Sequence, residues 1–539
     1  MDFYWSHILS IVLFAPMVGA VLIAFLPREN SKAIRYTALG FSVLTFALSV
    51  PLFFSYMGTL SGFQFVEIAP WIREWGISYH IGIDGISILL VLLTTFMSIL
   101  AIWFSFYVQN RIKEYMFFFL LLETGMLGVF MALDLVLFYV FWELTLIPMY
   151  FIIGIWGGAN RLYAAIKFFI YTFAGSLFML IAIVAIYYIH LNATGVSSFN
   201  LIDIQRVLAN GQIAPKVELW LFIAFALAFA IKVPLFPFHT WLPDAHVEAP
   251  TAGSVLLAAV LLKMGTYGFL RFCLPLFPDA SQAAVPWMMG LSVIGITYGA
   301  IVAAMQQDLK KLVAYSSVAH LGFVMLGMFA LNQQGITGSV LQMVNHGIST
   351  GALFLLVGIL YERTHTRSFK DFGGLKAQMP IYAALFLVIM LSSVGLPSTN
   401  GFVGEFLCLI GAFHTNFLGL YGTNLWFVVL ASLGVVLAAV YLLWMYQKVF
   451  YGPNDNPKNQ NLPDVKWWEG VIVASLIALV FWIGLYPKAL TDKMEVSVAH
   501  VISQTTLDRG ARPAWSEMTF KQMKVKKPAT KLAVKENDQ

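Results

Sequence analysis

The chain has 539 residues, of which 60% are hydrophobic and only 11% are charged, with a formal net charge of +5 and a mean hydropathy of +0.80. A soluble globular domain is about half apolar and about a quarter charged, so this composition excludes that class. The apolar residues form long runs instead of segments of alternating polarity, which argues against a membrane β-barrel. The sequence therefore predicts an all-α protein that crosses a membrane many times.

Several kinds of cofactor site are excluded as well. The chain contains two cysteines, Cys273 and Cys408, and no CxxC pair, whereas an iron–sulfur cluster usually takes about four cysteines. It has no P-loop and no glycine-rich dinucleotide motif, and no residue pair has the helix-face spacing of a metal site such as HExxH. We therefore expect no cofactor or metal on this chain, and we assign it no nucleic-acid partner.

Fourteen apolar runs are long enough to cross a membrane, because a spanning helix needs about 20 mostly apolar residues. In chain order they are 7–27, 33–56, 83–108, 114–133, 134–156, 164–190, 217–237, 249–273, 285–306, 308–330, 333–361, 379–412, 424–450 and 467–487. The seventh run is interrupted by Pro234 and Pro237, and the twelfth by Pro397 and Gly401. Broken helices at membrane depth occur where the backbone lines a cavity, so we expect a polar pocket in mid-membrane at these breaks.

The loop charges predict the orientation. Alternate loops, beginning with the one after the first run, contain sixteen Lys and Arg residues, and the remaining loops contain four. Because positively charged loops remain in the cytoplasm, both termini should face the periplasmic side. The last segment, 488–539, adds ten Lys and Arg on that side, and its end resembles a disordered basic tail.

Charged residues deep in the predicted spans are functional candidates, because a charge at the centre of a spanning helix costs about 2.5–3.5 kcal/mol. Glu143 lies about 14 Å along its helix from Asp134 and cannot easily reach the surface. Lys232 directly precedes the first break, where Pro234 and Pro237 should free backbone carbonyls at the negative end of a half-helix. The alternative is that Lys232 only forms an ion pair with Glu143 that holds two helices together.

Further charges lie within apolar helices. Lys263 is about 20 Å along the eighth span from Pro250, and a lysine removed from water can release its proton reversibly. Glu405 follows the second break, where the positive N-terminal end of the new half-helix suits a carboxylate. Glu123, in the fourth span, could equally belong to a structural pair. Lys167, near a cytoplasmic helix end, is best explained by snorkelling.

Four histidines are weaker candidates. His320 and His346 lie in the apolar tenth and eleventh spans, where an imidazole is a natural proton relay, although a lone buried histidine is often only a core residue. His239 and His246 lie beside the first break and could be interfacial. Taken together, the Lys, Glu and His side chains are what a proton or cation path inside a helix bundle needs.

Three stretches resemble the antiporter-like proton-translocating family: KFFIYTFAGSLFML, KVPLFPFHTWLPDAHVEAPTAGSVLLAAVLLKMGTYGFLRF and QQDLKKLVAYSSVAHLGFVMLG. This family comprises the large membrane subunits of respiratory complex I and the Mrp-type cation/proton antiporters. The resemblance covers spans 3 to 13. It implies fourteen helices with two inverted five-helix repeats, spans 4–8 and 9–13, each containing one broken helix.

The resemblance also implies roles for particular residues. Glu143, Lys232 and Lys263 match the glutamate and the two lysines that the family uses for proton translocation. The fourth position, in span 12, is usually lysine in the L-type and N-type subunits of complex I, but here it is Glu405. The implied divisions are 1–113 (first three spans), 114–273 (first repeat), 274–412 and 424–450 (second repeat), 467–487 (last span) and 488–539 (basic tail).

The function implied is that of a proton-pumping membrane subunit of NADH:quinone oxidoreductase in a bacterial inner membrane. FMN and the iron–sulfur clusters would belong to partner subunits, L-type and N-type subunits would be neighbours, and the peripheral arm would act indirectly. A proton would enter from the cytoplasm, reach Lys263, pass His320 and His346 toward Glu405, and leave outside. Separation of Glu143 from Lys232 would change the proton affinity of the lysine.

Three alternatives remain open at this point. The chain could be a subunit of an Mrp-type Na⁺/H⁺ antiporter, which uses no NADH. It could be a scaffold whose charges only pack helices. It could carry a quinone site, although the sequence contains no distinctive motif for one, because aromatic residues are common at membrane interfaces.

Overall fold

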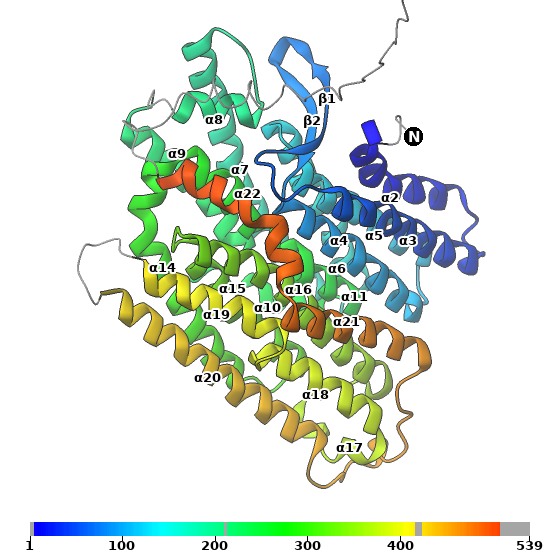
Figure 1. Cartoon of the computed structure of the whole chain (residues 1–539). Coiled ribbons are helices and arrows are strands. Elements are labelled where there is room, and N and C mark those ends of the chain that lie inside the picture. The colour runs from blue at the N-terminus through cyan, green and yellow to red at the C-terminus, as the bar shows by residue number, and fades with distance from the viewer. Residues whose placement is uncertain (1–4, 210–212, 416–422, 507–539) are drawn as a thin grey trace, which may run out of the picture.

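The computed structural model describes residues 5–209, 213–415 and 423–506, and these form long helices with one two-stranded hairpin (Figure 1). The sequence beyond residue 506, including the end predicted to be disordered, lies outside the described residues.

The helices follow one another in three groups. The first contains α2 (Ile8–Phe25), α3 (Ser31–Ser55), α4 (Ser87–Phe104), α5 (Ile112–Met131), α6 (Leu135–Trp156), α7 (Arg161–Thr194), α8 (Leu201–Ala209), α9 (Pro215–Lys232) and α10 (Trp241–Glu248). The second is one continuous rod of α11 (Thr251–Leu256), η3 (Leu257–Leu261), α12 (Leu262–Gly268), η4 (Phe269–Cys273) and α13 (Leu274–Leu276), in which η3 and η4 are π-helical. The third contains α14 (Pro278–Ala304), α15 (Leu309–Met328), α16 (Gln333–Thr364), α17 (Leu375–Gln378), α18 (Pro380–Val394), α19 (Asn400–His414), α20 (Thr423–Phe450), α21 (Trp467–Leu485) and α22 (Lys488–Thr506).

Within the described residues, twelve helices are long and apolar enough to cross a membrane, counting the rod as one. The other two predicted spans coincide with interrupted helices, α9 with α10 and α18 with α19. The multi-span helical architecture is therefore confirmed. The count of fourteen spans and the two inverted repeats remain predictions, because they require both interrupted helices to cross the membrane.

Local sequence explains where several helices begin. The carboxylate of Asp134 accepts hydrogen bonds from the backbone N–H groups of Val136 and Leu137 at 2.9 and 3.2 Å, which satisfies donors that the first turn of α6 leaves free. Asp308 does the same for Lys311 at the start of α15. Prolines, which have no N–H to leave unpaired, occupy the first turn of α9, α14 and α18: Pro215, Pro278 and Pro380.

The first break separates α9, which ends at Lys232, from α10, which begins at Trp241. The predicted run to residue 237 was therefore too long. The expectation of free carbonyls also needs correction, because the N–H of Leu235 donates to the carbonyl oxygen of Ala230 at 2.9 Å. The turn thus replaces a bond that the prolines remove, and the side chain of Lys232 is left at the end of the half-helix.

The second break runs from Gly395, whose φ is +84°, to Thr399. Gly401, predicted to interrupt the helix, instead belongs to the first turn of α19. A Cβ atom there would lie 2.1 Å from the carbonyl oxygen of Ser392. Glycine is therefore required for the close approach of α18 and α19, not for the break itself.

Two elements do not appear among the predicted spans. Strands β1 (Gln64–Ile72) and β2 (Ile77–Ile83) form an antiparallel hairpin in which Ile68 pairs with His80. The segment 488–506, predicted to be part of a basic tail, is helix α22, which crosses one face of the molecule and packs against α16, α14 and α13 (Figure 1). Its buried residues are Leu490, Met494, Ser497, Val498, Val501 and Thr505. These residues recur every three or four positions, so they form one buried face on a helix that is otherwise polar.

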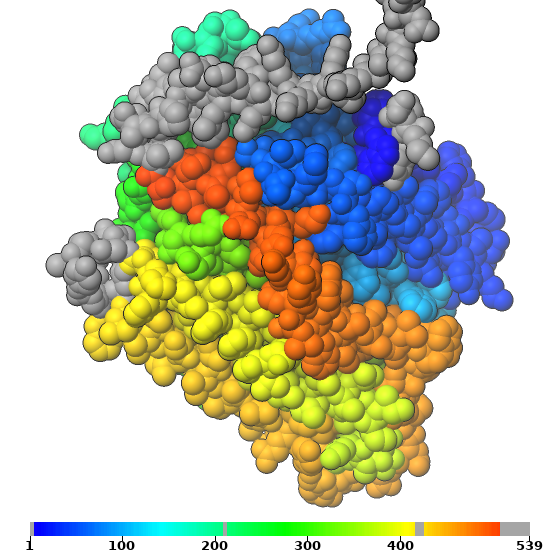
Figure 2. Space-filling model, viewed as in Figure 1, coloured from blue at the N-terminus to red at the C-terminus, as the bar shows by residue number. Residues whose placement is uncertain are grey.

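The rod and α16 form the centre of the bundle. All residues in their most apolar windows are buried, compared with 28% for α3 and α20 at the periphery. Figure 2 shows the covering of one face, where α21 and α22, coloured orange to red, lie between the blue N-terminal helices and the yellow-green second half. Titratable residues on the rod and on α16 are therefore shielded from lipid by other helices.

Candidate functional site

Lys263 lies in the centre of the rod and contacts α16. Its side chain is fully buried, and its Nζ lies 2.5 Å from His346 Nδ1 and donates to the carbonyl oxygen of Ala258 at 2.5 Å. Ala258 belongs to the π-helical segment η3, and such segments are frequent at functional sites. The local backbone thus gives Lys263 an oxygen partner, and the tertiary fold gives it an imidazole.

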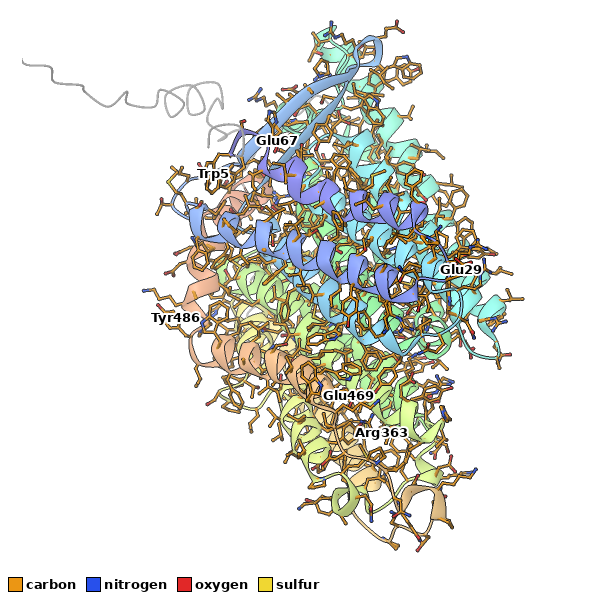
Figure 3. The ribbon with its side chains drawn as sticks, turned by 90° about the vertical axis from the view of Figure 1, so that its right-hand side faces the viewer. Trp5, Glu29, Glu67, Arg363, Glu469 and Tyr486 are labelled. Atoms are coloured by element: carbon orange, nitrogen blue, oxygen red, sulfur yellow. The ribbon has the colours of Figure 1, made fainter. Side chains whose placement is uncertain are left out.

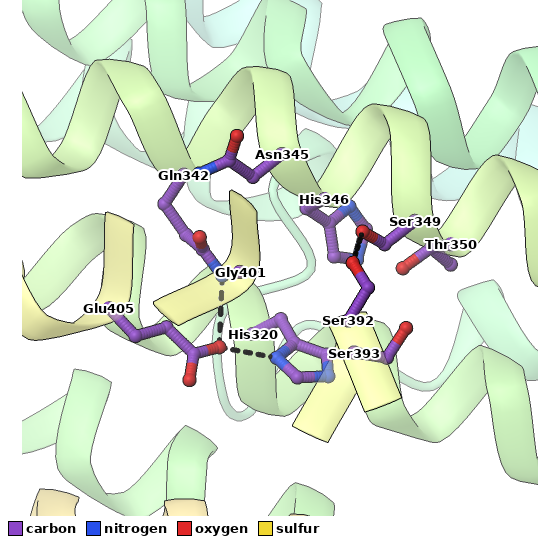
Figure 4. A pocket seen from close by; sticks show the side chains of 10 residues that line it. All are labelled: His320, Gln342, Asn345, His346, Ser349, Thr350, Ser392, Ser393, Gly401 and Glu405. Atoms are coloured by element: carbon purple, nitrogen blue, oxygen red, sulfur yellow. Dashed lines mark hydrogen bonds and ion pairs between the residues drawn. The ribbon is translucent and has the colours of Figure 1, made fainter. Parts of the chain in front are cut away.

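A second imidazole and a carboxylate continue this arrangement (Figure 4). The ring centroids of His346 and His320 are 5.9 Å apart. His320 Nδ1 lies 2.7 Å from Glu405 Oε1, and Gln342 Nε2 donates to the same oxygen at 2.9 Å. All of these side chains are buried. We refer to Lys263, His346, His320 and Glu405 as the titratable row.

A small polar cavity lies beside the row, at the second break (Figure 4). Its volume is about 10 Å³, which is the space of about one water molecule. Its walls are His320, Gln342, Asn345, His346, Ser349, Thr350, Ser392, Ser393, Gly401 and Glu405. The Nε2 atoms of His320 and His346 have no hydrogen-bond partner within the described part of the chain. The polar pocket expected at a break is therefore present at α18–α19.

The second break also fixes the position of Glu405. Asn345 donates to the backbone oxygen of Asn400 at 2.7 Å, and Ser392 donates to the Asn400 side chain at 2.6 Å, which ties α16, α18 and α19 together. Glu405 is the sixth residue of α19. The effect of a helix dipole falls off within the first turn. The carboxylate is therefore held by His320 and Gln342, not by the helix N-terminus as the sequence suggested.

Glu143 and Lys232 do not form the expected ion pair. No nitrogen–oxygen contact of 4.0 Å or less joins them, and Lys232 Nζ has no hydrogen-bond partner among the described residues. The amine instead lies 5.4 Å from the ring centroid of Trp142 and 5.6 Å from that of Phe168. This corrects the explanation in which the lysine only pairs with Glu143 to hold two helices together.

Glu143 lies at the edge of the bundle. Its side chain is half-buried, and residues one helical turn away, Val140 and Ile147, are 41% and 50% exposed. Lys232, in contrast, is fully buried. Glu143 therefore lies near the surface on which lipid or a neighbouring subunit would lie, with its Oε1 atom buried, while the lysine lies in the interior.

The histidines beside the first break, His239 and His246, are buried within the protein. His246 stacks on Phe354 with ring centroids 4.5 Å apart, and neither of its ring nitrogens has a hydrogen-bond partner in the described ranges. His239 lies 5.2 Å from the ring of Tyr298, and its Nδ1 is likewise without a partner there. Both ring nitrogens of His246 are thus without a protein partner in the described ranges, whereas His239 lies among aromatic rings.

The two remaining candidates from the sequence, Lys167 and Glu123, differ in whether they have a partner. Lys167 forms an ion pair of 2.7 Å with Asp244 of α10, which gives its ammonium a protein partner in addition to any snorkelling. Glu123 is fully buried, and neither carboxyl oxygen has a hydrogen-bond partner among the described residues. The structural pair suggested for Glu123 is therefore not formed.

Sequence reasoning missed three buried cations, Lys310, Arg271 and Arg363, because it counted them as loop charges. Lys310 donates from Nζ to the backbone oxygen of Ala249 at 2.5 Å, at the C-terminal end of α10. Arg271 forms a buried ion pair of 2.6 Å with Asp84. Their positions near helix ends gave no sequence signal, because the partners are brought together only by the tertiary fold.

Arg363 was also counted as a loop charge. It forms a buried ion pair of 2.6 Å with Glu469, joining α16 to α21 (Figure 3). Tyr107 donates to the same carboxylate at 2.5 Å. These groups link the end of the central helix to two peripheral elements and lie outside the titratable row. In the described residues, no group of three or more His, Cys, Asp or Glu side chains could hold a metal ion.

Comparisons with known proteins show which family the chain resembles. The family model for the membrane region of NADH:quinone oxidoreductase/Mrp antiporter proteins matches residues 132–442. NADH-quinone oxidoreductase subunit M of Rhodobacter capsulatus is 46% identical over 513 residues, covering 94% of this chain and 98% of that protein. NADH-ubiquinone oxidoreductase chain 4 of Marchantia polymorpha is 43% identical over 507 residues, covering 94% of this chain and 99% of that protein.

Solved structures show the same relationship. A chain of respiratory complex I from Thermus thermophilus with bound NADH has a TM-score of 0.82 at 31% identity, covering 93% of this chain and 100% of that chain. A chain of the Mrp complex from Dietzia sp. has a TM-score of 0.77 at 20% identity, covering 96% and 58%, and so shares the fold. The chain therefore belongs to the NADH:quinone oxidoreductase/Mrp antiporter family and, within it, to the subunit M and chain 4 group of NADH:quinone oxidoreductases.

Proposed function

We propose that the chain is the membrane subunit of NADH:quinone oxidoreductase that moves protons along the titratable row. Its partners are other membrane subunits of the complex. The observation that carries the proposal is the row itself, with contacts of 2.5 Å from Lys263 to His346 and 2.7 Å from His320 to Glu405 inside the bundle. Adjacent groups that alternate between amine, imidazole and carboxylate are what proton exchange over short distances requires.

The geometry suggests how each transfer occurs. The amine and Nδ1 of the Lys263–His346 pair are close enough to share one proton, either as an ammonium that donates to a neutral imidazole or as an amine that accepts from it. His320 and Glu405 form the corresponding pair at the other end. The two Nε2 atoms, which face no protein partner among the described residues, would be joined by one water in the adjoining cavity. The order is therefore Lys263, His346, His320 and Glu405.

Glu143 and Lys232 would control proton movement along the titratable row without being members of it. Quinone reduction in other subunits would move charge near the half-buried Glu143, and a change in the distance between Glu143 and Lys232, which form no ion pair in this structure, would alter the proton affinity of the lysine. The NADH-linked electron carriers, FMN and iron–sulfur clusters, would belong to partner subunits. We further propose that both termini face the periplasm, which a reporter fused at each end would test.

Inverted membrane vesicles containing the assembled complex test this function. NADH oxidation by quinone and acidification of the vesicle lumen are recorded together, with and without Na⁺, for the unaltered chain and for Lys263→Gln. We expect NADH-driven acidification that needs no Na⁺ and that falls by about tenfold or more in the variant, because one positioned acid–base group typically contributes about 100-fold or more. Transport that responds to Na⁺ and continues without NADH would instead identify an Mrp-type antiporter.

A further inference from the structure

A second cavity lies on the opposite side of α16 from the polar one. It has a volume of about 260 Å³ and is enclosed by α3, α4, α16, α21 and the first turn of α22. Every side chain that lines it is apolar. An engineered cavity of about 150 Å³ with apolar walls stays dry and binds benzene, so a cavity of this size accepts an apolar ligand and not water.

The cavity opens toward the membrane. Phe54 of α3 and Trp482 of α21 line it and are 75% and 43% exposed. Both helices are candidate membrane spans with only 28% and 33% of their apolar windows buried. Where no neighbouring subunit covers such helices, the hydrocarbon of the bilayer surrounds them. The chemical class of occupant that can enter sideways through this opening is therefore an acyl chain.

The polar end of the occupant is indicated by Lys493. The opening lies near the ends of α3 and α21, at Ser55 and Leu485, and a Trp side chain at such a level is typical of the membrane interface. Lys493 of α22 lies with Nζ 5.2 Å from the ring of Phe53, a cavity-lining residue. It donates to the backbone oxygen of Tyr56 at 2.7 Å, and among the described residues no carboxylate forms an ion pair with it. Its remaining ammonium hydrogens suit a phosphate.

We propose that this cavity binds one acyl chain of an anionic phospholipid whose phosphate contacts Lys493. The chain would pack against Val344 and Ile348, which lie on either side of His346 in the sequence of α16. Leu93 of α4, another lining residue, lies so close to Gly347 that an added Cβ would be 2.8 Å from it. The lipid would thus pack against the face of α16 that lies opposite the titratable row. This site is independent of the proton route.

The test uses the whole purified complex, delipidated mildly and reconstituted with phosphatidylglycerol or phosphatidylcholine. Val50→Trp fills the cavity from α3, and Val43→Trp, two helical turns away at a residue that is 45% exposed and does not line the cavity, is the matched control. Native mass spectrometry counts the phosphatidylglycerol molecules retained per complex. We expect Val50→Trp to retain one fewer than the unaltered complex and Val43→Trp to retain the same number. Lys493→Gln should remove the preference for phosphatidylglycerol over phosphatidylcholine.

Equal retention in Val50→Trp and Val43→Trp would overturn the proposal. If Val50→Trp fails to assemble, a cryo-electron microscopy map of the unaltered complex decides the matter. Unbranched density that runs from Lys493 into the cavity supports the proposal. A side chain of a neighbouring subunit in the cavity, the ring of a quinone headgroup at Lys493, or an empty cavity overturns it.

Discussion

His320 and Glu405 are 85 residues apart in the chain, yet His320 Nδ1 lies 2.7 Å from Glu405 Oε1. This contact joins α15 to the second half of a broken helix and ends the titratable row. Gln342 donates to the same carboxylate oxygen, which fixes its orientation. A carboxylate held at this distance from an imidazole is suited to accept a proton from it.

Shortening Glu405 should slow pumping without preventing assembly. Glu405→Asp withdraws the carboxylate by one methylene from His320, and Glu405→Gln removes its ability to take up a proton. We expect NADH-driven acidification to fall by about tenfold or more in both variants. Phe406→Leu, at the exposed neighbouring residue, is the control and should pump normally. Normal acidification by Glu405→Gln would show that the row does not end at this residue.

Replacing Lys263 by arginine should distinguish the contribution of its positive charge from the contribution of its exchangeable proton. A guanidinium keeps the positive charge but is not deprotonated in proteins. We expect Lys263→Arg to assemble more completely than Lys263→Leu but to pump as poorly, by about tenfold or more below the unaltered complex. Native gel electrophoresis measures assembly, and vesicle acidification measures pumping. Pumping by Lys263→Arg at the normal rate would mean that the lysine contributes only its charge.

Neutralising Glu143 should reduce oxidation and pumping together. Its carboxylate lies at the half-exposed edge of the bundle, apart from Lys232, so Glu143→Gln should leave the packing intact. We expect NADH oxidation by quinone and vesicle acidification to fall in parallel in the assembled complex. If oxidation and acidification both remain normal, Glu143 has no part in coupling. Loss of assembly instead would favour a scaffold role.

Glu123 should be dispensable for pumping. Its buried carboxyl oxygens make no hydrogen bond within the described residues, and an unsatisfied buried polar group costs about 1–3 kcal/mol. We therefore expect Glu123→Met, which keeps the length of the side chain, to pump normally and to raise the denaturation temperature of the complex. Thermal denaturation followed by activity loss measures this. A fall in acidification with normal assembly would place Glu123 on a proton route.

Breaking the Asp84–Arg271 pair should destabilise the assembled protein. Removing one partner of a buried ion pair leaves an unpaired charge, which costs about 3–5 kcal/mol. We expect Arg271→Leu to lower the denaturation temperature and Asp84→Asn with Arg271→Leu to recover part of the loss. The double-mutant comparison isolates the interaction between the two residues. Additive effects of the two substitutions would show that the pair does not contribute as a unit.

The breaks illustrate what the sequence could predict about the fold. Pro234 and Pro397 lie in apolar runs, and proline cannot continue the hydrogen-bonding pattern of a helix, so both interruptions follow from local chemistry. The exact boundaries did not follow, because Leu235 restores a bond to Ala230 and Gly401 lies inside α19. Helix α22 was not predicted because its composition is mostly polar, although one of its faces is buried.

By itself the sequence determined the class of protein, the apolar spans, the two breaks and the candidates Glu143, Lys232, Lys263 and Glu405, because the cost of burying a charge in hydrocarbon can be assessed residue by residue. Only the tertiary structure decided which candidates meet. It placed Lys263 against His346 and His320 against Glu405, kept Glu143 apart from Lys232, and buried Lys310 and Arg271 beside partners distant in the chain. Contacts between helices depend on how whole helices pack, and no local pattern of residues contains that information.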